Sequence, residues 1–451
     1  MQKLYAQTAL LPSGWASDVA LDIDANGTIA ALQANASPNG RERLHGPMVP
    51  AMPNLHSHSF QRAFAGLAEV ASHTPDSFWT WRDQMYRLVG QLTPEDVETI
   101  AAKLFIETMK GGFGAIAEFH YLHHAIGGQT YADPAELSRR IICAAHTTGI
   151  GLTLLPVFYA HSDFGGLAPN AGQARFIHDP DAFLKLLQKL ESQKSGFNLG
   201  LAFHSLRAAT PEEMRVILKH QPTSGPVHIH VAEQPREVEA CLAWSGKRPV
   251  ELLLGTFDVD RNWCLIHATH MVDAERGALA KSGAVAGLCP ATEANLGDGI
   301  FPAVAYQAVG GRYGIGTDSH IATGVAEELK TLEYGQRLRD LGRNRMAGAG
   351  GASTGRTLFD AALSGGAQAL GHHASGIAVG NPADFVVLNG ADPFIATAKG
   401  DQILDRWIFA RGDAVVRDVM VQGKWCIQAR RHAQDERIDR AFLQVLRRVA
   451  A

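Results

Sequence analysis

The segment Pro53-Asn54-Leu55-His56-Ser57-His58 follows an apolar run, residues 48–52, that is typical of a buried strand in a parallel sheet. If that strand continues through Leu55, His56 and His58 point to the same face, because side chains alternate along a strand. Zinc binds neutral imidazole nitrogen, so two histidines at the carboxyl end of one strand would supply two ligands of a metal site. Two polar loop histidines would give the same pattern, so the prediction depends on further ligands elsewhere in the chain.

Apolar runs of strand length, with helical patterns between them, recur along the chain. Two helices have clear starts, Thr93-Pro94-Glu95-Asp96 and Thr210-Pro211-Glu212-Glu213, with Thr at the N-cap, Pro at the first helical position and an acid at the third. Repeated βα units favour an α/β fold, a TIM-like (β/α)₈ barrel, over a doubly wound open sheet. The eight runs are residues 50–55, 115–119, 152–157, 199–203, 227–231, 264–267, 284–288 and 313–317.

Both ends of the chain are β-rich. Short apolar stretches at residues 6–11 and 19–23 are followed by a turn at Asn26-Gly27, and Gln422-Gly423-Lys424 is typical of a tight turn between two late strands. We therefore expect the two ends to pair into one small accessory β domain beside the barrel. The predicted units are residues 1–48 and 376–430 for the accessory domain, 49–375 for the metal-dependent barrel, 346–355 for a Gly/Ala-rich linker and 431–451 for an amphipathic C-terminal helix.

Composition excludes some classes of partner. The 451 residues carry 41 basic and 45 acidic side chains, a net charge of −4, which argues against a nucleic-acid or anionic-membrane surface. The five cysteines are scattered, odd in number and form no CxxC pair, as in a reduced protein. No uncharged apolar run approaches the about 20 residues of a membrane span, and no signal-peptide pattern is found. We expect a cytoplasmic protein with a small-molecule partner.

The missing metal ligands are found where barrel strands end, which is where barrels place their active sites. The fifth run contains His230, with Glu233 three residues later; the sixth ends in His267; and the eighth is followed by Asp318. Any one of these would more often be a satisfied polar group at a strand end, but together they can meet around one ion with a position open for water. That arrangement describes a catalytic metal. The predicted ligands are His56, His58, His230 and Asp318.

Catalytic roles follow from this chemistry. A bound Zn²⁺ lowers the pKa of its water from ~15.7 to about 7. Asp318 can take the proton of that water, His267 can hold the water and stabilise the developing charge, and Glu233 can pass a proton to a departing nitrogen. No lysine lies at the end of a predicted strand, so we expect no bridging carboxylated lysine and one divalent ion per subunit. Zn²⁺ is the metal we expect, although the same ligands suit Fe²⁺ or Mn²⁺.

Several motifs carry a family resemblance. HxH after the first strand, HVAE on the fifth, a His on the sixth and GTDS on the eighth resemble the amidohydrolase superfamily, in its mononuclear deaminase branch. Within it the chain is similar to the formimidoylglutamate deiminases, the iminohydrolases of bacterial histidine degradation, over about residues 48–340. The flanking β regions fit the accessory domain of the superfamily less specifically. The motifs of the closer match are MPNLHSHSFQRAFAGLAE, DSFWTWRDQMYR, AEFHYLHH, FHSLRAAT, HIHVAEQPREV and TEANLGDGIFP.

The resemblance implies a substrate, N-formimidoyl-L-glutamate, with two carboxylates and an amidine. It also implies that this substrate contacts Gln61, Arg82, Tyr121, His204 and Arg207, of which the two arginines can form charge-assisted bonds to a carboxylate. Each residue has another interpretation. Arg82 could be a solvated helix residue, Arg207 could cap the helix near residue 211, Tyr121 and His204 could pack at the rim, and Gln61 could be an exposed polar residue.

Other polar and aromatic residues near these motifs have less specific interpretations. His120, His123 and His124 are interpreted as polar residues of a loop, and Trp79 and Trp81 as pocket walls or packing residues. The stretch 292–302 is expected to form a tight loop over the mouth of the barrel. In that loop either Asn295 or Asp298 could touch substrate or position the loop, and the sequence does not decide between them.

The resulting functional hypothesis is hydrolytic deimination, in which metal-activated water attacks the formimidoyl carbon, ammonia leaves and N-formyl-L-glutamate forms. The first alternative is a deaminase of a nucleobase or another small amidine or aromatic amine. Two arginines aimed at the pocket argue against it, because a neutral base offers no partner for two buried cations. The second alternative, a barrel that has lost catalysis and serves as a scaffold, predicts a broken ligand set, whereas all four ligands are present. Relatives suggest a homodimer.

Overall fold

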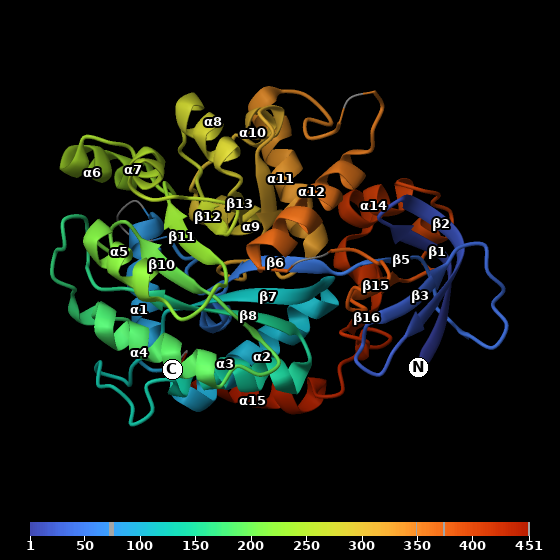
Figure 1. The fold of residues 1–451 in the computed structure, drawn as a ribbon, viewed down its shortest axis with the longest axis horizontal. Coiled ribbons are helices and arrows are strands. Elements are labelled where there is room, and N and C mark those ends of the chain that lie inside the picture. The colour runs from blue at the N-terminus through green and yellow to red at the C-terminus, as the bar shows by residue number, and fades with distance from the viewer. Residues whose placement is uncertain (72–75, 349, 373–374, 450–451) are drawn as a thin grey trace.

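A (β/α)₈ barrel and a second, smaller sheet make up the computed structural model, which describes residues 1–71, 76–348, 350–372 and 375–449 (Figure 1). The eight barrel strands are all parallel and follow chain order around the sheet, which confirms the predicted fold class. They are β6 (Met52–Ser57), β7 (Phe113–His120), β8 (Gly151–Phe158), β10 (Leu201–Ser205), β11 (Val227–Val231), β12 (Trp263–His267), β13 (Val285–Leu288) and β14 (Arg312–Ile315), with the short β9 (Asn198–Leu199) beside β8.

The barrel closes between its first and last strands. Ser57 pairs with Asp318 in a parallel bridge, and the backbone N–H groups of Thr317 and Asp318 both donate to the carbonyl of His56. Gly316 permits this approach, because a Cβ at that position would lie 2.7 Å from the Cβ of His56. Closure therefore places Asp318 directly beside the histidines of β6, although β14 itself ends three residues earlier.

The helices surround the barrel, and both predicted helix starts are confirmed. The side chain of Thr93 accepts from the backbone N–H of Asp96, and that of Thr210 accepts from the N–H of Glu213. One helix, α1 (Phe78–Val89), is an addition to the βα repeat, inserted between β6 and the first regular barrel helix. The others are α2 (Pro94–Lys110), α3 (Glu136–Thr148), α4 (Pro180–Ser192), α5 (Pro211–His220), α6 (Pro235–Ser245), α7 (Pro249–Thr256), α8 (Asp273–Ser282), α9 (Pro290–Leu296), α10 (Ala303–Ala308), α11 (Val325–Asp340) and α12 (Thr354–Ala369).

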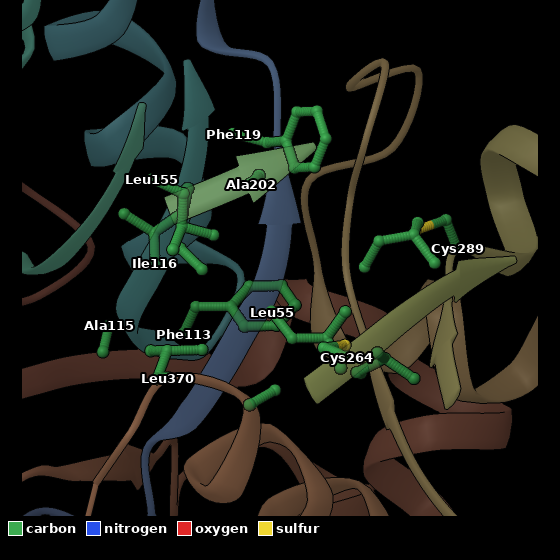
Figure 2. Close-up of a cluster of buried hydrophobic side chains, with 14 of the residues drawn as sticks. Leu55, Phe113, Ala115, Ile116, Phe119, Leu155, Ala202, Cys264, Cys289 and Leu370 are labelled. Atoms are coloured by element: carbon green, nitrogen blue, oxygen red, sulfur yellow. The ribbon is translucent and has the colours of Figure 1, made fainter. Parts of the chain in front are cut away.

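Apolar side chains fill the interior of the barrel, so it is a packed core and not a pore (Figure 2). Leu55 and Phe113 lie in this core together with Ile116, Leu155 and Cys264, all fully or almost fully buried. All five cysteines are free thiols, in agreement with the reduced state expected from the sequence. Polar chemistry is therefore confined to the carboxyl ends of the strands.

The second sheet joins the two ends of the chain, as expected (Figure 1). Its N-terminal and C-terminal parts meet where β5 (Met48–Pro50) pairs antiparallel with β15 (Phe385–Leu388). The predicted turn at Gln422-Gly423 is present, with φ of 47° and 72°. The remaining strands are β1 (Gln2–Leu11), β2 (Gly14–Ile23), β3 (Ile29–Gln33), β4 (Glu42–Arg43), β16 (Val416–Val421) and β17 (Lys424–Ile427), connected from β15 by the short helices α13 (Pro393–Ala396) and α14 (Gln402–Arg406).

The C-terminal helix α15 (Asp435–Val449) packs along α2 and is anchored by Lys110, whose ammonium lies 2.7 Å from Asp435. Residues 450–451 of the predicted helix and residue 349 of the predicted linker lie outside the described residues. The domain boundaries remain a prediction. Among the described helices, none combines the length and apolarity needed to cross a membrane.

Candidate active site

Three histidines from two strands converge at the carboxyl end of the barrel. The Nε2 atom of His56 lies 3.2 Å from Nε2 of His58 and 3.0 Å from Nε2 of His230. Asp318 completes the group, with its Oδ1 atom 3.3 Å from Nε2 of His58 and 3.5 Å from Nε2 of His56. All four side chains are buried. The structure thus brings together the four residues expected to bind metal.

The donor set fits a cation. Nδ1 of His58 lies 3.0 Å from the carbonyl of Phe119, and Nδ1 of His230 lies 2.9 Å from the carbonyl of His204. A carbonyl only accepts, so each Nδ1 carries the proton and each Nε2 presents a lone pair. Both lone pairs face Nε2 of His56, which can donate to one of them at most. A divalent ion among these nitrogens would resolve that conflict.

The protonation state of the three histidines suits this role. Burial, with His56 beside it, lowers the pKa of His58 to about 3. Burial also lowers the pKa of His56 and of His230 well below the ordinary value, and the neighbouring imidazoles add to the effect. All three therefore stay neutral at physiological pH, which is the form that binds metal.

His267 lies among carboxylates beside the metal ligands. Its Nε2 atom is 3.6 Å from Glu233 and 3.8 Å from Oδ2 of Asp318, and its Nδ1 atom is 3.3 Å from Glu293. Burial alone lowers the pKa of His267, but the carboxylates outweigh it and raise that pKa to about 10. Burial raises the pKa of Glu233 as well. The group therefore combines His267, which retains its proton at neutral pH, with Glu233, which is protonated more readily than an ordinary carboxyl group.

Three residues at this end of the barrel have a left-handed backbone conformation. Ala232, His267 and Asp318 have φ of 51°, 67° and 45°, a region that Asp and His adopt more readily than most residues, so the clearest strain is at Ala232. Each lies at or just beyond the end of its strand. Such strain persists where the surrounding structure fixes the geometry, which is typical of functional sites.

A small cavity opens beside the histidines, and α1 contributes Phe78, Trp81, Arg82, Met85 and Tyr86 to its lining. The five residues expected to contact substrate all line it: Gln61, Arg82, Tyr121, His204 and Arg207. Two of the competing interpretations are wrong. Gln61 is not an exposed polar residue, since it is 3% exposed, and Arg207 does not cap α5, whose cap is Thr210.

Two unpaired cations face this cavity. Neither Arg82 nor Arg207 forms an ion pair with any described residue, and the Nε atom of each is buried without a hydrogen-bond partner. The indole of Trp79 lies between them, 4.6 Å from the guanidinium of Arg82 and 5.7 Å from that of Arg207. Arg207 is buried and Arg82 is half-buried, and although Glu233 and Glu237 act on the charge of Arg207, no described carboxylate lies within ion-pair distance of either guanidinium. The two groups therefore have donors free for an anion in the cavity.

The histidines after β7 are buried, which the sequence-based interpretation as polar loop residues did not anticipate. His120 is the last residue of β7, and His123 and His124 follow it. His123 donates to the carbonyl of Val157 at 2.9 Å, and His124 to that of Ile177 at 2.7 Å. These two hydrogen bonds hold the loop after β7 against β8 and the loop that follows it, and so support the wall of the cavity.

The segment after β13 contributes residues that the sequence analysis left open or missed. The expectation of a tight loop over 292–302 is wrong for residues 292–296, which belong to α9 (Pro290–Leu296). Asn295 donates to Glu69 at the surface, at 2.8 Å, whereas Asp298 is 1% exposed and lies among Glu233 and His267. Glu293, which accepts from His267, was not singled out at all. Tyr86 and Tyr159 also line the cavity and were not anticipated. For the residues of this segment, the signal that the sequence offered was the presence of acidic residues in the TEANLGDG motif.

Comparison with known proteins gives a consistent pattern. Residues 48–426 match the model of the amidohydrolase family, and residues 1–46 match that of the N-terminal domain of formimidoylglutamate deiminase HutF. The formimidoylglutamate deiminase of Pseudomonas aeruginosa is 56% identical over 448 residues, 99% of each chain. The crystal structure of an amidohydrolase from Brucella melitensis is 49% identical, with a TM-score of 0.95 over the whole of both chains. An adenosine deaminase from Xanthomonas campestris with bound zinc shares the fold, at 21% identity and a TM-score of 0.82, covering 100% of this chain and 98% of that one.

Proposed function

The chain belongs to the amidohydrolase family and, within it, to the formimidoylglutamate deiminases, and we propose that it hydrolyses N-formimidoyl-L-glutamate to N-formyl-L-glutamate and ammonia. The observation that carries this proposal is the pair of arginines, Arg82 and Arg207, that form no ion pair with a described residue and lie in the wall of a cavity also lined by the metal-ligand candidates His58 and His230. Two cations match the two carboxylates of this substrate, whereas a neutral nucleobase would offer neither guanidinium an anionic partner.

One divalent ion per subunit, which we expect to be Zn²⁺, would be held by His56, His58, His230 and Asp318. When bound, it supplies Lewis-acid activation of a water molecule. Support comes from the neutral imidazoles, whose lone pairs face one another at 3.0–3.2 Å, and from the zinc in the Xanthomonas campestris relative. The nitrogen and carboxylate donors also suit the borderline-soft character of this metal.

The protein groups move the protons. Water attacks the formimidoyl carbon and Oδ2 of Asp318 takes one of its protons, while the Nε2–H of His267 donates to the attacking oxygen. Glu233, which lies 3.6 Å from His267, gives a proton to the imino nitrogen, so that the tetrahedral carbon carries an OH and an NH₂ group. Asp318 then passes its proton to the NH₂ group, the OH group returns a proton to Glu233, and the C–N bond breaks to leave ammonia and the formyl group. The raised pKa of Glu233, caused by burial, suits a group that must donate a proton near neutral pH.

Gln61, Tyr121 and His204 would orient the substrate. Gln61 donates to the hydroxyl of Tyr121 at 2.9 Å, which leaves the Tyr121 hydrogen free for an acceptor in the cavity. His204 stays neutral, because burial and the nearby arginines lower its pKa well below the ordinary value. We further propose that the enzyme works as a cytoplasmic homodimer, and the absence of disulfides agrees with that compartment.

The test is ammonia release from N-formimidoyl-L-glutamate, with guanine, cytosine and adenosine assayed in parallel, before and after chelation. We expect release from the first compound only, and its loss on chelation. Glu233→Gln should lower kcat by at least about 100-fold, as expected for loss of a general acid. Glu239→Gln, at an exposed position of α6, the helix that begins two residues after Glu233, is the matched control. Release from a nucleobase but not from the amidine would overturn the proposal.

A further inference from the structure

Phe176, in the loop after β8, is surrounded by three tyrosines from three different segments. Its ring centroid lies 5.6 Å from that of Tyr86 on α1, 5.0 Å from that of Tyr121 after β7 and 5.7 Å from that of Tyr159 after β8. Tyr86 and Tyr159 line the cavity next to Arg82 and Arg207. Neither tyrosine has a role in the reaction described above, although their hydroxyl groups lie in the part of the site that would bind carboxylates.

The orientation of Gln173 determines what Tyr159 can do. The backbone N–H of Asn170 donates to Oε1 of Gln173 at 2.8 Å, which identifies that atom as the oxygen of the amide. The other atom, Nε2, lies 2.7 Å from the hydroxyl of Tyr159 and must be the donor, because an amide NH₂ does not accept. The oxygen of Tyr159 therefore accepts from Gln173, and its own hydrogen is directed to another group.

The hydroxyl hydrogen of Tyr159 remains available to a ligand. None of the hydrogen bonds among the described residues has the Tyr159 hydroxyl as its donor, although its oxygen accepts from Gln173. Tyr159 lines the cavity together with Arg82 and Arg207. A phenol in this position can therefore donate to an acceptor that enters the cavity.

We propose that Tyr159, held by Gln173, donates its O–H to one carboxylate of the substrate, beside Arg82 and Arg207. The inference rests on the proposed function and deepens it by assigning a neutral donor to a site otherwise made of cations. A carboxylate offers about four acceptor positions, so it can receive a phenol and a guanidinium together. The phenol adds a directional hydrogen bond to the charge of the guanidinium groups, which favours a carboxylate over a spherical anion.

A set of near-isosteric substitutions separates this role from general packing. In Gln173→Glu the new carboxylate accepts from Tyr159, so the hydroxyl hydrogen is no longer available to the substrate. Tyr159→Phe removes the hydroxyl. For both variants we expect about tenfold weaker substrate capture, seen as a raised KM with kcat within about twofold. Tyr334→Phe, at an exposed position of α11, is the matched control, and its KM should stay within about twofold of wild type.

A double-mutant cycle distinguishes loss of the hydrogen from simple charge repulsion by the new glutamate. If the hydrogen is what matters, Gln173→Glu adds nothing in a Tyr159→Phe background, whereas repulsion would weaken binding further and count against the proposal. Calorimetric titration with glutarate, which has the two carboxylates but no amidine, measures the same effect without chemistry. An active wild-type enzyme whose two test variants bind glutarate like wild type would overturn this inference alone. A wild type that releases no ammonia from N-formimidoyl-L-glutamate would instead overturn the proposed function.

Discussion

The carboxylate of Glu293 lies 3.3 Å from Nδ1 of His267, and this contact determines which nitrogen of the ring faces the cavity. Glu293 is itself fixed, because the backbone N–H of Cys289 donates to the same oxygen at 2.9 Å. It is buried and reaches His267 from α9, whereas the reacting atoms would lie on the other side of the imidazole. Glu293 therefore acts through His267, as a positioning residue.

Replacement of Glu293 by Gln should lower kcat, because the ring of His267 loses both its charged partner and its preferred protonation state. We expect a decrease of about tenfold or more in kcat, with KM changed by less than about threefold, measured by steady-state ammonia release. Glu327→Gln, at an exposed position of α11, serves as the control. A variant with reduced stability but an unchanged kcat would show that the contact only supports the fold.

Arg207→Ala should weaken substrate capture more than turnover. The guanidinium is 5% exposed and unpaired, so removal leaves a substrate carboxylate in a cavity with half its positive charge. A fall of about 100-fold in kcat/KM, mostly through KM, corresponds to the about 1.5–3 kcal/mol of a charged hydrogen bond. Arg207→Lys should restore little, since an ammonium cannot form a bidentate contact. Arg215→Ala, on the exposed face of α5, controls for loss of a positive charge, and a kcat/KM equal to wild type would exclude Arg207 from the pocket.

The sequence predicted those parts of the fold and site that have a local pattern. All eight barrel strands, including the one that carries His230, overlap the predicted apolar runs, because a buried parallel strand is apolar throughout. The four metal-ligand candidates were found because each lies at or just past such a run. Tyr159 and Tyr86 were not found, since they line one cavity only after α1 folds over the barrel, and no periodicity in the sequence records that arrangement. Glu293 was missed for the same reason.

A pH effect on stability is expected from Asp413, far from the reacting groups. It lies against the N-terminus of α11, and burial raises its pKa to about 6 although the backbone N–H of Ala326 donates to it. A carboxyl group with a raised pKa in the folded state favours folding in its protonated form. Its contribution is therefore complete below the ordinary pKa of 3.8 and is lost as the pH rises to about 6.

Asp413→Asn removes that dependence while it keeps a polar group of the same shape. We expect the variant to gain stability relative to wild type as the pH rises. The difference in unfolding free energy, variant minus wild type, should be larger at pH 7 than at pH 4 by on the order of 2 kcal/mol. Urea unfolding at both values measures it. Asp258→Asn, at an exposed position, is the control. If the variant and wild type differed in unfolding free energy by the same amount at both pH values, Asp413 would not carry an uncompensated charge in the folded protein.

Metal removal should destabilise the protein as well as inactivate it. Without a cation, the lone pairs of His58 and His230 both face Nε2 of His56, which lies 3.2 Å from one and 3.0 Å from the other. Chelation should therefore lower Tm, and added Zn²⁺ should restore it in a concentration-dependent way, since a ligand that binds only the folded state stabilises it. His230→Ala should abolish the response of Tm to Zn²⁺ and reduce bound zinc per chain, measured by elemental analysis, while the exposed His220→Ala leaves both intact. Asp318→Asn should remove nearly all turnover, because it loses both a ligand and the group that accepts the proton of the water. A His230→Ala enzyme that still binds one zinc and melts higher with it would place the metal elsewhere.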